Sequence, residues 1–218
     1  MVRSNTHKKQ IKKRRHQITE WDNLGINYWS FSKCGSTSIK NSLVSMKHGK
    51  EKDQGSMKDA LAIHSSPELK YISPDEAETN GFVNICVVRH PYDRVLSLYR
   101  DFALKRPEKI FISTIVDQNK VTDLNYFIEE VIGVSTDKDD IHFRSYLGHL
   151  THKGNIFADK IYRFENIDMF FFDFNLPVSL LNTTNKTNGI NVKDLTSIQK
   201  KIIRTRYFED FGYFKFES

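Results

Sequence analysis

The 218-residue sequence has only two cysteines, Cys34 and Cys86, and no long apolar run. Two cysteines do not make the disulfide framework of a small secreted domain, which favours a reducing compartment. A membrane-spanning helix needs about 20 apolar residues, and no stretch of this sequence is that long. The basic start of the chain is not followed by an apolar segment, so no signal peptide is expected. These absences predict a cytoplasmic protein without a membrane span.

The sequence also lacks internal repeats, low-complexity segments and any convincing spacing of metal ligands. The eight histidines are scattered, so no metal site is expected. What the chain does have is positive charge, with a formal net charge of +6 at pH 7. This surplus favours anionic partners such as nucleotides, acidic glycans or nucleic acid.

The length fits one domain with a real core, and only the start of the chain stands apart in composition. We predict a basic, mobile N-terminal arm at residues 1–24 and a single domain at residues 25–218. Lysines and arginines dominate residues 8–15, and such a block is usually solvated and mobile. It could be a plain arm, an arm that recruits an acidic acceptor, or a polyanion-binding or nuclear-import-like tail.

Residues 26–43 predict a strand, a turn of small residues and the start of a helix. Residues 26–32 alternate and are rich in aromatic side chains, as in a short buried strand. A helix N-terminus after such a turn carries partial positive charge and unsatisfied N–H donors, which suits an anion. Lys33 adds a full charge and the hydroxyls add donors. The predicted phosphate cradle consists of Lys33, Cys34, Gly35, Ser36, Thr37 and Ser38.

This turn, which we call the Lys33 turn, is not a Walker A loop, because Lys33 precedes the only glycine. A P-loop-type nucleotide kinase is therefore a poorer match, although it stays open as an alternative. A helix capped by Ser36, with Lys33 as a solvated neighbour, would explain the same residues without any function. A non-catalytic polyanion-binding protein that depends on the basic arm is the other alternative.

A second strand and helix are predicted around Arg89. Residues 82–88 are a β-branched run, typical of a strand buried on both faces, and Pro91 suits the first position of a helix. Arg89 thus lies where a parallel strand ends, the usual side for ligands in open α/β sheets. Ser97, about two turns into the helix, could share one anion with Arg89. Arg94 is expected on the charged outer face of this helix.

These two stretches together resemble the sulfotransferases that use 3′-phosphoadenosine 5′-phosphosulfate (PAPS). The Lys33 turn is similar to the 5′-phosphosulfate loop of carbohydrate sulfotransferases, P-K-x-x-x-T-S, with Ser32 in place of the proline. Arg89 is followed eight positions later by Ser97, which is the spacing of the family's 3′-phosphate segment. Residues 203–213 resemble the closing Y-x-x-D-F-x-x-F-G-Y helix of glycan sulfotransferases.

The resemblance implies a three-layer α/β/α fold with a central parallel sheet, of the P-loop NTPase-like type. It implies an enzyme that moves a sulfuryl group from PAPS to an acceptor hydroxyl, expected on a carbohydrate, and releases PAP without a metal. No specific nucleic-acid partner is expected. Lys33 would neutralise charge on the leaving phosphate, Thr37 and Ser38 would bind the 5′-phosphate, and Arg89 with Ser97 would hold the 3′-phosphate.

The resemblance also suggests the general base. In 2-O-type glycan sulfotransferases a histidine between the two phosphate segments has this role, and His64 matches by position. Imidazole titrates near neutral pH, so it can take a proton from a sugar hydroxyl. Glu68 is a weaker candidate. His142 is the second histidine, in a stretch similar to the D-x-H-W-x-x-Q segment of these enzymes. An N-K-T segment that covers the nucleotide in related enzymes suggests weak contacts from Asn185, Lys186 and Thr187.

The remaining segments are expected to complete the layers. Residues 159–165 predict another parallel strand, and residues 124–132 and 194–208 predict helices. Residues 65–81 are rich in polar residues and predict a loop beside the acceptor site. The aromatic run at residues 169–174 has helical spacing and is expected in the core.

Overall fold

The structure is a computed structural model that describes residues 17–48, 62–110, 116–178 and 189–217. The chain divides into two compact units, each with its own apolar core. The sheet unit is Met1–Val88 with Leu150–Thr183, and the helical unit is Arg89–His149 with Thr184–Ser218. Most of the predicted arm, residues 1–16, lies outside the described residues. So do three predicted nucleotide contacts, Asn185, Lys186 and Thr187.

The sheet unit contains a five-stranded sheet in the order β3-β1-β2-β4-β7. Neighbours β2, β4 and β7 are parallel, whereas β1 is antiparallel to both β2 and β3. The sheet is therefore mixed, whereas a parallel sheet was predicted. Its strands are β1 (Ile18–Trp21), β2 (Ile26–Trp29), β3 (Lys70–Ile72), β4 (Val83–Val88) and β7 (Lys160–Arg163). A separate hairpin pairs β5 (Thr151–His152) with β6 (Asn155–Ile156).

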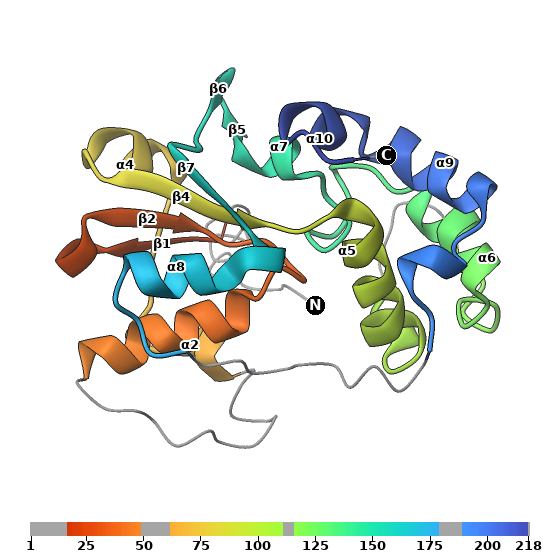
Figure 1. Cartoon of the computed structure of the whole chain (residues 1–218), viewed down its shortest axis with the longest axis horizontal. Helices are drawn as coiled ribbons and strands as arrows, with labels where there is room; N and C mark the ends of the chain where they lie inside the picture. Colours follow the sequence, from red (N-terminus) through yellow and green to blue (C-terminus); the bar gives the residue numbers. More distant parts are fainter. Residues whose placement is uncertain (1–16, 49–61, 111–115, 179–188, 218) are drawn as a thin grey trace, which may run out of the picture. The chain divides into compact units, whose positions relative to one another are not determined.

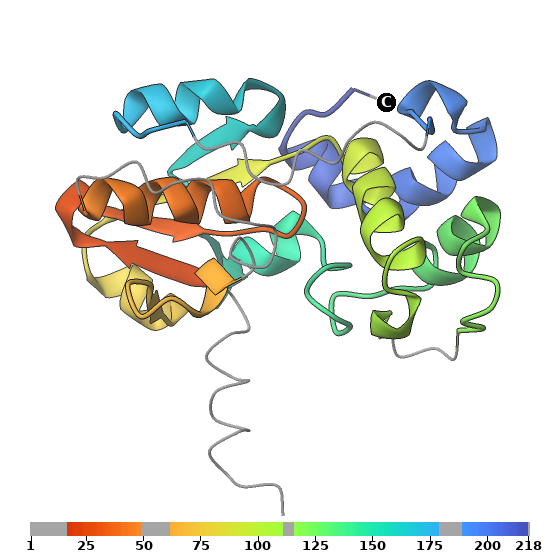
Figure 2. The ribbon, with the colours of Figure 1, turned by 90° about the horizontal axis from the view of Figure 1, so that it is seen from below.

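Helices cover both faces of this sheet. In Figure 1, α4 lies on one side of the strands, and α2 and α8 lie on the other. Seen from below, α2 crosses the near side of the sheet unit (Figure 2). This layering confirms the predicted α/β class. The helical segments are η1 (Asp22–Leu24), α2 (Ser36–Lys47), η2 (Ile63–Ser65), α4 (Pro74–Thr79), η6 (Phe164–Asn166) and α8 (Ile167–Asp173).

Alternation along the strands assigns side chains to the two layers. Tyr28 of β2 joins the apolar cluster shared with α2 and α8. Asn27 turns to the other face, where its amide donates to the Ala77 carbonyl of α4 at 3.3 Å and to Asn84 Oδ1 at 3.2 Å. The indole of Trp29 donates to the same oxygen at 3.0 Å. The α4 layer is thus held by satisfied buried polar groups, which are costly to disrupt.

Two segments that were expected to be irregular are regular in the structure. Residues 18–21, assigned to the arm, form β1, in which Ile18 is fully buried. The expected loop at 65–81 contains β3 and α4, and Ser73 caps α4 in a capping box with Glu76. The arm prediction therefore fails from residue 18 onward, because this segment pairs with β2 and β3.

The aromatic run on α8 is only partly core, contrary to the prediction. Phe170 and Phe171 are buried, but Met169 is 59% exposed and Phe172 is 86% exposed. A helix lying on a sheet buries one face, and residues three apart share a face. Met169 and Phe172 therefore point away from the sheet together.

The helical unit carries the second predicted helix. As expected, α5 starts at Pro91, and it continues as a π-helical segment. The expected helices at 124–132 and 194–208 are present in shorter pieces. The elements are α5 (Pro91–Leu98), η3 (Tyr99–Ala103), η4 (Pro107–Lys109), α6 (Leu124–Tyr126), η5 (Phe127–Ile132), α7 (Tyr146–Leu150), η8 (Val192–Asp194), α9 (Ser197–Arg206) and α10 (Phe208–Tyr213).

Arg94 lies in the core of the helical unit and not on the expected outer face, since it is only 2% exposed. Its guanidinium donates to the carbonyls of His142 at 3.1 Å and Arg144 at 2.7 Å. It also lies over the rings of Tyr146 and Tyr207, 4.6 and 5.5 Å from their centres. Carbonyl acceptors and aromatic faces compensate a buried cation, so α5 is tied to the segment before α7.

Candidate anion-binding site

The Lys33 turn lies at the carboxyl edge of the parallel strands. Because β2, β4 and β7 run in the same direction, the segments that follow them leave the sheet at one edge. After β2 the chain continues into the Lys33 turn, and after β7 it continues into Phe164. This is the edge at which open α/β sheets bind their ligands.

Two residues of this turn have left-handed backbone conformations. The φ angle is 67° at Lys33 and 75° at Gly35. Glycine adopts this conformation at little cost, whereas it costs other residues about 1–2 kcal/mol. Such strain is concentrated at binding and catalytic sites. A strained lysine at a strand end therefore supports a binding role for Lys33.

Position 35 also has little room for a side chain. A Cβ atom there would lie 2.9 Å from Phe164 Cε2 and 3.0 Å from Ile167 Cδ1. Gly35 is the N-cap of the 12-residue helix α2, and its carbonyl accepts from the N–H of Ile39 at 3.0 Å. The first turn of α2 has no acidic residue to offset the helix dipole. This end of the helix therefore favours an anion.

The remaining predicted phosphate ligands differ in exposure. Ser36 and Thr37 are partly exposed, so their hydroxyls can meet a ligand. Ser38 is 4% exposed and Cys34 is fully buried. The Cys34 sulfur lies 3.6 Å from the carbonyl of Ser32, inside the turn. Cys34 could therefore face an anion only with its backbone.

His64, the predicted base, lies against the first turn of α2. Its Nε2 is 3.1 Å from Thr37 Oγ1, which joins the predicted base to a predicted phosphate ligand within the sheet unit. Glu68, the weaker candidate, follows η2 and pairs with the opposite end of α2, 3.3 Å from His48 and 3.9 Å from Lys47. Of these two candidates, His64 is the one that contacts the turn.

Lys40 is a residue of this site that the sequence analysis missed. It is fully buried, with Nζ 3.5 Å from His64 Nδ1 and 3.3 Å from the Tyr71 hydroxyl. The same hydroxyl donates to the His64 carbonyl at 3.1 Å. Burial lowers the pKa of Lys40 to about 7. The available signal was its position three residues after Thr37, on the same face of the helix.

Arg89 follows directly on β4 and belongs to the helical unit. Its backbone is held at two points by the phenol of Tyr146, which accepts from the Arg89 N–H at 3.2 Å and donates to the Arg89 carbonyl at 2.9 Å. Tyr146 is fully buried, and its own N–H donates to Asp210 at 2.9 Å. These contacts fix the main chain at Arg89, which stays partly exposed. Ser97, within α5, is only 5% exposed.

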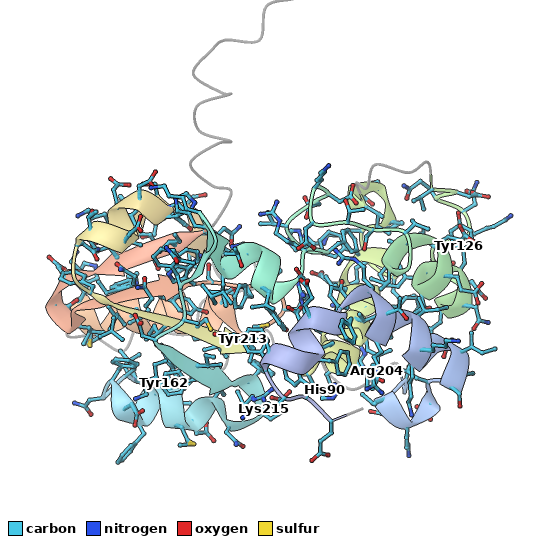
Figure 3. All side chains as sticks on the ribbon, turned by 90° about the horizontal axis from the view of Figure 1, so that it is seen from above. His90, Tyr126, Tyr162, Arg204, Tyr213 and Lys215 are labelled. Carbon is cyan, nitrogen blue, oxygen red and sulfur yellow. The ribbon has the colours of Figure 1, made fainter. Side chains whose placement is uncertain are left out.

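His90, labelled in Figure 3, caps the helix that begins beside Arg89. Its Nδ1 accepts from the N–H of Tyr92 at 3.3 Å, and its Nε2 lies 2.8 Å from the Glu217 carbonyl. The ring of Phe216 meets it edge-on, with centroids 5.2 Å apart. His90 therefore ties the start of α5 to the end of the described chain.

His142, the second predicted base, belongs to the helical unit, whereas Lys33 and His64 share the sheet unit. Its Nδ1 contacts Asp140, and its ring meets Phe102 with centroids 4.7 Å apart. Burial raises the pKa of Asp140, but the hydrogen bond and charge of His142 outweigh it and hold this pKa below its usual value. A histidine oriented by a carboxylate is chemically able to act as a base.

One cluster among the described residues has the ligand types for a cation: Asp75, Glu78 and His152. Lys153 already pairs with both carboxylates, at 2.5 Å from Asp75 and 3.4 Å from Glu78. The cluster lies on α4 and the β5–β6 hairpin, apart from the Lys33 turn. It is explained as a surface ion-pair network.

Comparison with known proteins agrees with the resemblance seen in the sequence. The model of the Sulfotransferase family matches residues 16–217, a range that includes both the Lys33 turn and Arg89. No curated protein and no solved structure matches the chain. None of the helices described here is long and apolar enough to cross a membrane. The chain therefore belongs to the Sulfotransferase family, whose enzymes transfer sulfuryl groups.

Proposed function

We propose that this protein transfers the sulfuryl group of PAPS to an acceptor hydroxyl, with a carbohydrate as the acceptor class, and releases PAP. The observation that carries the proposal is the strained lysine at the strand end, followed by an uncompensated helix N-terminus. The carbohydrate part depends on the Lys33 turn and on residues 203–213, which resemble the glycan-sulfating members of the family.

The Lys33 turn fits a phosphosulfate. When bound, PAPS would supply an activated sulfuryl group whose departure leaves negative charge on the 5′-phosphate. Lys33 and the first N–H groups of α2 would stabilise that charge, and such preorganised donors usually give the largest catalytic contribution. With the donor bound, the single hydroxyl hydrogen of Thr37 would turn from His64 Nε2 to the 5′-phosphate. Ser38, at 4% exposure, would contribute from a more enclosed position.

Arg89 and Ser97 are proposed to bind the 3′-phosphate. A guanidinium presents a fork of donors that matches phosphate oxygens. The Tyr146 hydroxyl holds the Arg89 backbone, so the side chain starts from a fixed point. Recognition of this phosphate would select the donor over nucleotides that lack it.

His64 is proposed as the general base that removes the proton of the acceptor hydroxyl. A positioned base contributes roughly 100- to 10,000-fold to a rate. His64 is preferred to His142 because it contacts Thr37 at 3.1 Å. We therefore expect His64→Ala to lower kcat by at least about 100-fold. The same change at His142 should have a much smaller effect.

The donor part of the proposal is tested by titrating PAP in a calorimeter. Wild type should bind PAP and should bind ATP with Mg²⁺ much more weakly. This difference in affinity separates a sulfotransferase from a P-loop-type kinase. Lys33→Gly relieves the left-handed strain, so it should fold normally yet bind PAP at least about tenfold more weakly, since it loses a charged phosphate contact. Lys215, another lysine with positive φ (51°), offers the control Lys215→Gly.

Arg89→Ala should likewise weaken PAP binding while a nucleotide without the 3′-phosphate is affected less. A chain without residues 1–16, which keeps β1 and loses the basic block, should still bind PAP, whereas a polyanion-binding protein that depends on its basic arm would lose its ligand. If wild type binds no PAP, or binds ATP equally well, the proposed donor is wrong. Transfer of labelled sulfate to a panel of glycans, phenols and peptides then tests the acceptor class.

A further inference from the structure

Beside the Lys33 turn lies a polar cluster of the sheet unit that contains the buried Lys40 and the partly exposed His64 and Tyr71. Tyr71 donates to the His64 carbonyl and lies 3.3 Å from Lys40 Nζ. The ammonium or amine of Lys40 also lies 5.1 Å from the centre of the Tyr71 ring. The remaining contact of Lys40 is to His64 Nδ1, at 3.5 Å. The cluster thus holds the histidine by its backbone and by one ring nitrogen.

The other ring nitrogen of His64, Nε2, is directed to Thr37 at the start of α2. A neutral imidazole carries one hydrogen, and the nitrogen without it is the one that can accept a proton. The partner at Nδ1 decides which nitrogen this is, because the partner either accepts the hydrogen or donates its own. For His64 to act as a base toward the Lys33 turn, Nδ1 must carry the hydrogen and Nε2 must be the acceptor.

We propose that Lys40 is a positioning residue that accepts the Nδ1 hydrogen of His64 and so leaves Nε2 as the basic nitrogen beside Thr37. The role deepens the proposed function, on which its catalytic consequence rests. The tautomer itself is a property of the protein alone, and it can be measured without donor or acceptor.

The charge state of Lys40 supports this assignment. A lysine ammonium has no lone pair and can only donate, whereas the neutral amine can accept. Burial lowers the pKa of Lys40 to about 7, so the amine is well populated in mildly alkaline solution. Of the described groups that titrate, His64 of η2 and Tyr71 of β3 face Lys40. Glu68, on the turn after η2, is paired with the far end of α2.

The side chain of Lys40 would otherwise be hard to explain. Burying an amine without a charged partner costs free energy, and a methionine of similar length would fill the same space without that cost. Tyr71 already fixes the His64 backbone, so Lys40 is not needed to hold the segment. Control of the ring nitrogen is a role that an apolar side chain could not take.

The test is the 15N spectrum of the histidine rings in the full-length, 15N-labelled protein at pH 8.5, with the His64 signals assigned by His64→Gln. Wild type should show Nδ1 protonated and Nε2 unprotonated. Lys40→Met removes the acceptor and should move the hydrogen to Nε2, the tautomer that free histidine prefers. Lys40→Gln offers a neutral oxygen acceptor and should restore the Nδ1 hydrogen. Lys47→Met, on the exposed end of the same helix, should leave the spectrum unchanged.

The same variants are then assayed for sulfuryl transfer. Lys40→Met should lower kcat at least about tenfold, within the range that a positioned base contributes, while the KM for PAPS stays within about twofold. Lys40→Gln should recover most of kcat. A wild-type protein with the hydrogen on Nε2, or a Lys40→Met spectrum identical to wild type, would overturn the proposal. If PAP does not bind wild type, the proposed donor fails, but the spectra still decide the role of Lys40.

Discussion

The substitution Gly35→Ala adds a single methyl group to the anion-binding turn and so tests its geometry. Gly35→Ala places a Cβ 2.9 Å from Phe164 Cε2 and 3.0 Å from Ile167 Cδ1, in a backbone with φ of 75°. Overpacking of this kind typically costs 1–3 kcal/mol, and the left-handed backbone adds about 1–2 kcal/mol. The smaller entropy of the unfolded alanine chain returns about 0.4–1 kcal/mol. We therefore expect the free energy of unfolding to fall by about 2–4 kcal/mol.

Gly25→Ala is the matched control for this change. Gly25 has a similar φ of 63°, but a Cβ there would meet nothing within 4 Å. It should therefore lose only the backbone part, about 0–1.5 kcal/mol. The two variants are compared by urea unfolding at constant pH, with the unfolding midpoint and slope both reported. The difference between them measures the contact with Phe164 and Ile167.

A second comparison identifies the contact itself. Phe164→Leu removes the ring that faces Gly35, so the double variant should lose less stability than the sum of the two single variants, by at least about 0.5 kcal/mol. Gly35→Ala should also weaken PAP binding, because the displaced backbone forms the start of the predicted cradle. Equal losses at Gly25 and Gly35, with additive behaviour at Phe164, would refute the packing argument.

Three further predictions concern buried polar groups. Burial raises the pKa of Asp210 to about 6 despite the N–H donors that face its carboxylate. The folded protein therefore holds this proton at a higher pH than the unfolded chain does, and the free energy of unfolding of wild type should fall as pH rises from 4 to 6. Asp210→Asn should flatten this part of the pH profile, measured by urea unfolding at each pH. The pKa of Lys40 is lowered instead, so the free energy of unfolding of wild type should rise by up to a few kcal/mol from pH 7 toward pH 10.5. Lys40→Met should be more stable than wild type at pH 7 and should lack this rise. Asn84→Ala leaves the indole of Trp29 and the amide of Asn27 without their shared acceptor. It should lower the free energy of unfolding by about 2–4 kcal/mol, measured by thermal or urea unfolding. A loss below about 0.5 kcal/mol would contradict the buried network.

The strands and turns that carry the site could be predicted from the sequence because their signals are local. The β-branched run before Arg89 predicts the buried strand β4, and Pro91 predicts the start of α5. The aromatic alternation before Lys33 predicts β2. Such patterns depend on neighbours in the chain and not on distant partners. His64 could be placed only through the family resemblance.

The parts that the sequence did not reveal depend on distant contacts. Lys40 and Arg94 are charged residues in helices, and charged residues are almost never buried without partners. Arg94 was therefore predicted on an outer face, and no role was predicted for Lys40. Their compensation comes from Tyr71 and from the carbonyl of Arg144, which lie far along the chain. The strand β1, in a segment predicted to be part of the arm, was missed for the same reason, because it lies between β2 and β3 and β3 comes about 50 residues later.

The cap at His90 has a practical consequence for work on this enzyme. The carbonyl of Glu217 touches the histidine that immediately follows Arg89. An affinity tag fused directly after Ser218 would begin two residues beyond that carbonyl and would put strain on the start of α5. Donor affinities measured on a C-terminally tagged protein should therefore be repeated after the tag has been cleaved, before any weakness is attributed to Arg89 itself.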